Sequence, residues 1–344
     1  MNTLRPFRYR WLISAALIVC AAFTALAAGK QIRINLGTLA PRGSTYLQSL
    51  QKMKEKWQQA PGGGVRLVIY PDGSQGGEAD MIRLMNVDTL QAGLLTGVGL
   101  TDIEERVAGL QGVPMMFRDF EEFDYVSSKL QPFMEKYIAQ KGFVVLFWVD
   151  AGWVRYFSKS PMHEPDDLKK MKIFAWAGNP EQITILKKYG YNPVSLETAE
   201  ILPMLKRDTI NAVSCPPIFA LAGQIDTDAK YMIELNWAPL IGACVVKKEA
   251  WDAIPEATRK VLRESAVVAG EEIRANAREE SERSVQAMRK RGLQVIKVTP
   301  EMEAKWRAAA EEAYPDIRGA MVPEDVFDEA QRLIKEYRAR KAEK

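Results

Sequence analysis

The chain has 344 residues, which is longer than one average domain and favours two. Apolar residues make up 47% of the chain, enough for ordinary hydrophobic cores, and the net charge is only +3. We find no basic patch interleaved with aromatic residues, so composition and charge argue against a nucleic-acid partner.

The first 27 residues have the pattern of a cleavable signal peptide. Arginines within MNTLRPFRYR precede a long apolar run, which ends in the small-x-small pattern Ala25-Leu26-Ala27. Cys20 raises the idea of lipidation, but Val19 stands where a lipoprotein needs a small residue. We therefore expect export to the periplasm and no lipid anchor.

Motifs for catalysis or cofactor binding are missing from the sequence. The single histidine, His163, lies in a proline-rich turn, and there is no G-x-S-x-G, Walker or G-x-G-x-x-G motif. We therefore expect no metal and no cofactor. An export compartment permits a disulfide between Cys215 and Cys244, although two isolated cysteines are more often buried apolar residues.

The first half of the chain alternates predicted strands and helices. QIRINLG has the alternating pattern of a strand, and the helix after Ser44 has an apolar face at Tyr46, Leu50, Met53 and Trp57. VRLVIY and QAGLLTGVG are further strands, separated by a helix at 78–87. This alternation predicts an α/β lobe with a largely parallel sheet. The apolar run FVVLFWVDAGWVRYFSKSP is long enough to be a strand that crosses from one lobe into another.

A second α/β series follows, with strands KKMKIFAW, NPVSL and TINAVSC. The segment 255–291 then keeps apolar or small residues at a three-or-four spacing, between Pro255 and Gly292. Such a helix is about 55 Å long and should span both lobes.

We therefore predict an α/β, two-lobed periplasmic binding protein fold with crossing strands and a long helix spanning both lobes. The expected division is a signal peptide at 1–27, lobe I at 30–150 plus 241–280, and lobe II at 151–240 plus 281–344, including the C-terminal helices.

Six stretches resemble one family, in the right order, over about residues 32–298: LGTLAPRGS, VIYPDGSQGGEADMIRLM, GVPMMFRDFEEF, DLKKMKIF, YGYNPVSLETAEILPMLKRDTINAV and VVKKEAWDAIPE. They are similar to the solute receptors of tripartite ATP-independent periplasmic (TRAP) transporters, of the dicarboxylate-receptor (DctP-like) type. The resemblance implies a periplasmic protein, not an enzyme, that closes on a small molecule, often an organic acid. It also implies a membrane permease, driven by a sodium or proton gradient, as the partner.

In this family a run similar to DLKG-KIR ends in an arginine that holds the ligand carboxylate with two hydrogen bonds. The matching residue here is Phe174. A second family arginine follows the glycine of the crossing strand. After Gly152 the matching position falls on Val154, and Arg155 is one residue off, on the opposite strand face.

Two interpretations follow. In the first, Phe174, Trp176 and Trp153 line an apolar cleft, and the ligand is neutral or hydrophobic, because a buried carboxylate without a cation costs several kcal/mol. Some relatives that lack the arginine work with tetratricopeptide-repeat partner proteins on hydrophobic ligands, so the resemblance suggests such a partner here. In the second, the aromatic residues are core, and Arg155 or another cation holds an organic acid.

Other candidate ligand-binding residues lie at strand ends or helix starts: Thr38, Gln75, Glu78, Asn179, Gln182, Pro216, Phe219 and Trp237. Each also has a structural explanation, such as helix capping for Asn179 or backbone stiffness for Pro216. Two functions of other classes remain open. The first is a periplasmic enzyme that uses Glu181 and Glu78 as an acid–base pair, and the second is a sensory module.

Overall fold

The computed structural model describes residues 32–62 and 64–343, and the expected signal peptide and Cys20 lie outside them. The strands form one nine-stranded sheet of order β2-β1-β3-β8-β4-β7-β5-β6, with β9 paired to β8. The strands are β1 (Ile32–Thr38), β2 (Val65–Tyr70), β3 (Ala92–Thr96), β4 (Phe143–Ser158), β5 (Lys172–Trp176), β6 (Asn192–Leu196), β7 (Ala212–Cys215), β8 (Tyr231–Lys247) and β9 (Gln294–Ile296).

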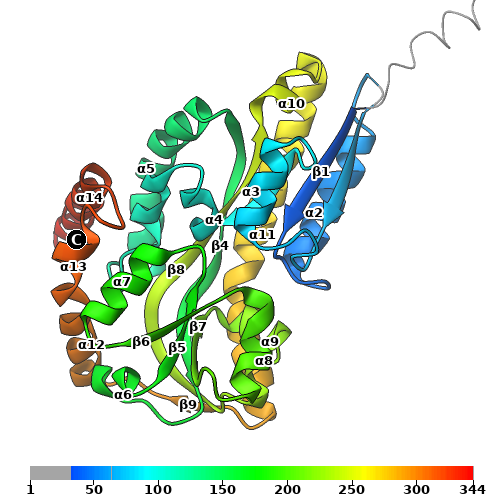
Figure 1. Cartoon of the computed structure of the whole chain (residues 1–344). Helices are drawn as coiled ribbons and strands as arrows, with labels where there is room; N and C mark the ends of the chain where they lie inside the picture. Colours follow the sequence, from blue (N-terminus) through cyan, green and yellow to red (C-terminus); the bar gives the residue numbers. More distant parts are fainter. Residues whose placement is uncertain (1–31, 63, 344) are drawn as a thin grey trace, which may run out of the picture.

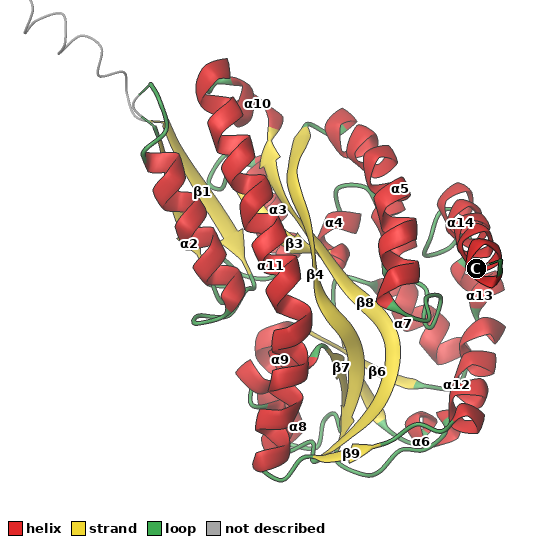
Figure 2. Ribbon diagram, turned by 180° about the vertical axis from the view of Figure 1, so that it is seen from behind, coloured by secondary structure: helices red, strands yellow, loops and turns green. Residues whose placement is uncertain are grey.

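Helices cover both parts of this sheet (Figure 2). Those of the first half and middle are α2 (Thr45–Gln58), α3 (Glu78–Asn86), α4 (Gly97–Thr101), η1 (Glu105–Leu110), α5 (Phe120–Gln140), α6 (Pro165–Lys169), α7 (Pro180–Lys188), η2 (Thr198–Glu200), α8 (Ile201–Lys206), α9 (Pro217–Ala222) and η3 (Ile225–Thr227). Those that follow are α10 (Lys248–Asp252), α11 (Glu256–Lys290), α12 (Pro300–Glu312), α13 (Tyr314–Ile317) and α14 (Glu324–Ala342). Within the described residues, none combines the length and the hydrophobicity needed to cross a membrane.

Two long antiparallel strands, β4 and β8, join the two lobes (Figure 1). The first lobe is built on parallel β1, β2 and β3, and the second on parallel β5, β6 and β7. At about 3.3 Å per residue, a strand of 16 or 17 residues is long enough to belong to both lobes. The predicted crossing strand is therefore confirmed.

Gly152 lies where β4 changes register, between Asp150 and Trp153. Its φ of 84° is in the left-handed region, and an added Cβ would lie 3.2 Å from Ser281 Oγ on α11. A larger residue would therefore be strained in its backbone and crowded by the long helix.

The long helix α11 has 35 residues and packs on α2 of the first lobe, on β4, and on α9 of the second lobe. Its buried residues recur every three or four positions, from Thr258 to Met288, as the sequence spacing predicted. The fold expected from the sequence is confirmed in these respects.

The C-terminal helices differ from the expectation that 281–344 belongs with lobe II. α12 packs on α6 of the second lobe, whereas α14 packs on α5 and η1 of the first. The apolar face of α14, including Phe327 and Leu333, shares one hydrophobic core with Phe123 and Leu130 of α5. The end of the chain therefore contacts both lobes.

The cysteines do not form the disulfide that was left open. Cys215 on β7 and Cys244 on β8 are both free thiols, and burial raises the pKa of each. Strand β4 lies between β7 and β8 in the sheet, so the two thiols are on strands that are not neighbours. Each thiol packs as a small apolar residue.

Candidate functional site

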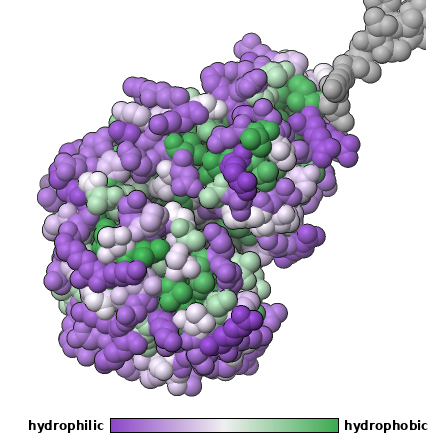
Figure 3. Space-filling model, viewed as in Figure 1, coloured by the Kyte–Doolittle hydropathy of each residue, from purple (hydrophilic) through white to green (hydrophobic). Residues whose placement is uncertain are grey.

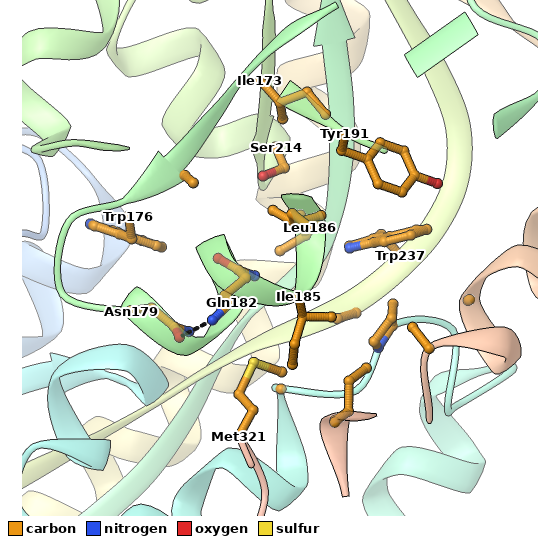
Figure 4. Close-up of a pocket in the computed structure, with 18 of the residues that line it drawn as sticks. Ile173, Trp176, Asn179, Gln182, Ile185, Leu186, Tyr191, Ser214, Trp237 and Met321 are labelled. Atoms are coloured by element: carbon orange, nitrogen blue, oxygen red, sulfur yellow. Dashed lines mark hydrogen bonds between the residues drawn. The ribbon is translucent and has the colours of Figure 1, made fainter. Parts of the chain in front are cut away.

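A cavity lies where the crossing strands meet the second lobe and the C-terminal helices (Figure 4). About 140 Å³ of it is open to the centre of a water molecule, and the whole space between atoms, including the mouth, is about 1120 Å³. Its lining is Val98, Gln111, Gly112, Pro114, Val154, Tyr156, Ile173, Phe174, Ala175, Trp176, Asn179, Gln182, Ile185, Leu186, Tyr189, Tyr191, Ser214, Trp237, Ala238, Leu240, Ala309, Ala310, Ala313, Ile317 and Met321. Figure 3 shows apolar residues on both sides of the hollow between the lobes.

The lining of this cavity contains no charged side chain. Its polar groups are amides, hydroxyls and an indole N–H. Within the described residues, the side chains of Gln182, Ser214 and Tyr191 and the Trp237 indole N–H make no hydrogen bond to protein, so they are free for a bound molecule or water. Burial raises the pKa of Tyr191 and Tyr156, which keeps both phenols neutral.

Aromatic rings form much of the wall. Phe174 and Trp176 on β5 meet edge to face, with 5.8 Å between ring centroids. Trp237 on β8 meets Tyr156 on β4 in the same manner at 5.2 Å. Phe174 is only 4% exposed and also belongs to the core of the second lobe. It is therefore a core residue and a wall residue at once.

The start of α7 supplies two of the polar groups. Asn179 is the N-cap, and its side-chain oxygen accepts a hydrogen bond from the Gln182 backbone N–H at 3.0 Å. Pro180 follows at a position where its missing N–H has no cost. Capping therefore explains the position of Asn179, while both side chains still line the cavity (Figure 4).

Arg155 and Trp153, two candidates from the sequence, lie outside the lining of this cavity. Their neighbours Val154 and Tyr156 line it instead. Arg155 faces α11, where its Nη2 contacts Glu282 Oε1 at 2.7 Å, and its Nε and Nη1 have no hydrogen-bond partner among residues 32–62 and 64–343. Trp153 packs on Phe120 in the core of the first lobe, with 4.9 Å between ring centroids.

A second, smaller cavity lies beside the first, where β1 and β3 end near α9. Thr38 and Phe219 line it, and Leu240 lines both cavities. Neither cavity is lined by Gln75, Glu78 or Pro216.

The contacts of these three residues are with neighbouring backbone and side chains. Glu78 is buried and accepts hydrogen bonds from Thr96 Oγ1 at 2.6 Å and from Gly99 N at 3.0 Å, which fixes the start of α4. Burial raises its pKa. Pro216 is the residue before α9, and Gln75 Nε2 donates to the carbonyl of the adjacent Ser74.

The rims of the two lobes meet around the cavity. A Cβ on Gly178 would lie 3.7 Å from Val98, and one on Gly77 would lie 2.7 Å from Glu197 Oε2. Asp102 lies near Glu181 of the opposite lobe and near the buried Glu78. The pKa of Asp102 is raised by burial and then by Glu181, and that of Glu197 by burial and then by Asp80. Among the described residues, no cluster of three or more metal-binding side chains occurs.

Comparison with models of known protein families identifies the family of this chain. Residues 36–319 match the model of the bacterial extracellular solute-binding protein family 7, DctP. The chain belongs to this family. Its members are described as bacterial extracellular solute-binding proteins, so the chain is a solute-binding protein.

Relatives with known ligands cover most of this DctP-family protein. The 2,3-diketo-L-gulonate-binding periplasmic protein YiaO of Escherichia coli is 26% identical, over 72% of this chain and 75% of the relative. The C4-dicarboxylate-binding periplasmic protein DctP of Rhodobacter capsulatus is 22% identical, over 78% and 80%. A TRAP solute-binding protein of Shewanella oneidensis with bound succinate shares the fold, with a TM-score of 0.82, 17% identity, and coverage of 89% of this chain and 100% of that one.

Several wall residues of this DctP-family protein were not candidates from the sequence, among them residues after β5 and in the C-terminal helices. These include Tyr189, Tyr191, Ala309, Ala310, Ala313, Ile317 and Met321. The helix that carries the alanines, PEMEAKWRAAAEE, has the composition of a charged surface helix. The run of small residues in it was the available signal.

Proposed function

We propose that this receptor captures a neutral or largely hydrophobic small molecule in the cavity between its lobes and delivers it to a TRAP membrane permease. The observation that carries the proposal is the lining without a charged side chain. A buried carboxylate needs a cation or a full set of hydrogen bonds to offset its loss of hydration. Aromatic faces such as those of Trp176 and Trp237 instead favour apolar surface.

An organic acid is the alternative, because YiaO is named for 2,3-diketo-L-gulonate and the Shewanella protein holds succinate. In this chain the neutral donors of Gln182, Ser214 and Trp237 would have to hold the carboxylate. Arg155 could do so only by leaving Glu282 and crossing to the other face of β4. The uncharged lining therefore favours a neutral cargo.

The family context supports a permease as the partner that receives the cargo. For a hydrophobic cargo we also propose a tetratricopeptide-repeat protein of the periplasm as a partner. Such a molecule dissolves poorly, so transfer between protein cavities avoids its exposure to water.

Native mass spectrometry of the receptor purified gently from its own periplasm tests the cargo. The complex is weighed intact, and the small molecules are then extracted and identified. We expect a neutral or lipid-like molecule. A bound organic acid would overturn the proposed ligand class while leaving the protein a solute receptor.

A further inference from the structure

We propose that the alanine wall of the cavity, defined as Ala309, Ala310 and Ala313, sets the length of the cargo, and that the cargo is an uncharged molecule with a polar head and an apolar tail directed at this wall. This inference rests on the proposed function, because it requires a neutral cargo in the cavity. It adds the shape of that cargo and the residues that select it.

The alanine wall recedes from the cavity because its residues carry no side chain beyond Cβ. The spacing of 309, 310 and 313 places them on one side of α12 and its C-terminal end. Ala310 is 3% exposed and Ala313 is 9% exposed, so the residual opening lies toward the cavity that they line. Ile317 and Met321 continue the same apolar surface.

Hydrogen bonds hold the alanine wall to the first lobe. Arg307 Nη1 donates to the carbonyl of Met115 at 2.6 Å, and the Tyr314 hydroxyl donates to the carbonyl of Pro114 at 2.9 Å. Met115 has a φ of 52°, which is uncommon for a residue with a side chain, and its N–H donates to the carbonyl of Trp237 at 2.6 Å. The segment before α5 is thereby tied to α12 and to the aromatic wall together.

Contacts with α7 hold the alanine wall from the other side. The Tyr189 hydroxyl donates to Asp316 Oδ2 at 2.6 Å, and Lys188 Nζ pairs with Asp316 Oδ1 at 2.6 Å. α12 and α13 are thus fixed from both sides of the cavity. We therefore expect the wall to resist displacement by a longer tail and so to discriminate by length.

The amide groups of Asn179 and Gln182 lie beside Trp176 (Figure 4), whereas the side chains of Tyr191 and Trp237 pack in the same cluster as Ala310 of the alanine wall. The free amide groups of Asn179 and Gln182 can take a hydroxyl, ester or amide head. An apolar tail then fills the space toward α12 and α13.

Straight-chain alcohols from butanol to dodecanol test the inference, by displacement of the neutral fluorophore N-phenylnaphthylamine from the full-length mature protein. Ala310→Leu puts a larger side chain into the tail end of the cavity. Ala308→Leu is the matched control on the same helix, because Ala308 is exposed and lines no cavity. Ala309→Leu is a second cavity variant at a less buried position, for the case that Ala310→Leu does not fold.

We expect wild type to bind alcohols more tightly with increasing chain length up to a limit. Ala310→Leu or Ala309→Leu should weaken the longest bound alcohols by about tenfold, which is about 1.4 kcal/mol, and leave short ones nearly unchanged. Ala308→Leu should bind as wild type does.

Equal weakening at every chain length, or no change in either cavity variant, would overturn the role of the wall. Wild type that binds no alcohol would overturn the amphipathic shape of the cargo. The proposed function is tested separately, by the charge of the co-purified molecule. An organic acid would contradict it.

Discussion

The two faces of β4 handle charge in opposite ways. On the cavity side, Val154 and Tyr156 belong to a lining without any charged residue. On the side of α11, Asp150 is 1% exposed and Arg155 is 6% exposed, and both make ion pairs with the long helix. Charged residues are therefore buried on β4 where they pair with α11. The absence of charge is specific to the face of β4 that lines the cavity.

The two ion pairs on the charged face also differ from each other. Asp150 is enclosed and accepts hydrogen bonds from Arg278 Nη2 at 2.8 Å, from Arg278 Nε and from Gly152 N. Arg155 pairs instead with a carboxylate, Glu282, whose side chain is 57% exposed. Removing the arginine should leave a buried, unpaired carboxylate in the first case and a solvent-exposed carboxylate in the second.

The largest effect is expected from Arg278→Leu. It leaves the Asp150 carboxylate buried without its cation, and we expect a loss of about 3 kcal/mol in the free energy of unfolding. Removing one partner of a buried ion pair usually costs about 3–5 kcal/mol. We expect the lower end of this range because the Arg278 side chain is 27% exposed. Urea unfolding measures it. Arg283→Leu, which breaks an exposed pair with Glu279 on the same helix, should stay within about 0.5 kcal/mol of wild type.

Phe174→Arg puts a charge on the neutral face. We expect the amount of retained neutral cargo to fall by about tenfold or more, because the guanidinium must lose hydration at a site that is 4% exposed. Native mass spectrometry of the variant purified from the periplasm measures the retention, and titration with succinate tests for a gain of acid binding. Phe174→Leu is the apolar control. Unchanged retention in Phe174→Arg would show that the cargo lies elsewhere.

The pH should affect how far the lobes close. With the lobes in contact, burial and then the neighbouring Glu181 raise the pKa of Asp102, and burial and then Asp80 and Glu200 raise the pKa of Glu197. We expect separation of the lobes to reduce the burial and to remove the contributions of Glu181 and Asp80, which come from the opposite lobe. The closed form then binds more protons than the open form, so closure is favoured as pH falls from neutrality toward about 4, and is lost as pH rises. Of the groups named here, Asp80 alone has a cation partner, Arg83.

Small-angle scattering of the cargo-free protein measures this effect as a smaller radius of gyration at acid pH. Combined Asp102→Asn and Glu197→Gln should flatten the pH profile, whereas Glu279→Gln on α11 should leave it unchanged. If the radius of gyration still depends on pH after the double substitution, Asp102 and Glu197 are not the groups responsible.

The smallest effect is expected from Arg155→Met. Two guanidinium nitrogens of Arg155 have no partner, and the carboxylate left behind is solvated, so the free energy of unfolding should change by no more than about 1 kcal/mol. Cargo retention should match wild type. A clear loss of cargo with unchanged stability would mean that Arg155 reaches the ligand after all.

Local patterns predicted much of the fold, because the crossing strand, the long helix and the strand–helix alternation all depend on spacing along the chain. Phe174, Trp176, Asn179, Gln182 and Trp237, chosen from sequence as candidates, line the cavity, since strand ends and helix starts meet at one edge of the sheet. Their role in ligand binding stays a prediction.

Features that depend on distant contacts could not be predicted. The register shift after Asp150 sets which residues of β4 face the cavity, and no local pattern marks it. The place of the alanine wall depends on Arg307 and Tyr314, which reach the carbonyls of Met115 and Pro114. Glu78 at the start of α3 fits a binding role and a capping role equally well by sequence.

The alanine wall also bears on the order in which the receptor becomes competent. The two hydrogen bonds that hold it to the first lobe join residues 192 and 200 positions apart in the chain. Contacts over such separations carry a loop-closure cost that slows folding. Because the lining runs from Val98 to Met321, the cavity needs residues of both lobes and of the C-terminal helices at once. We therefore expect cargo binding to require the complete fold.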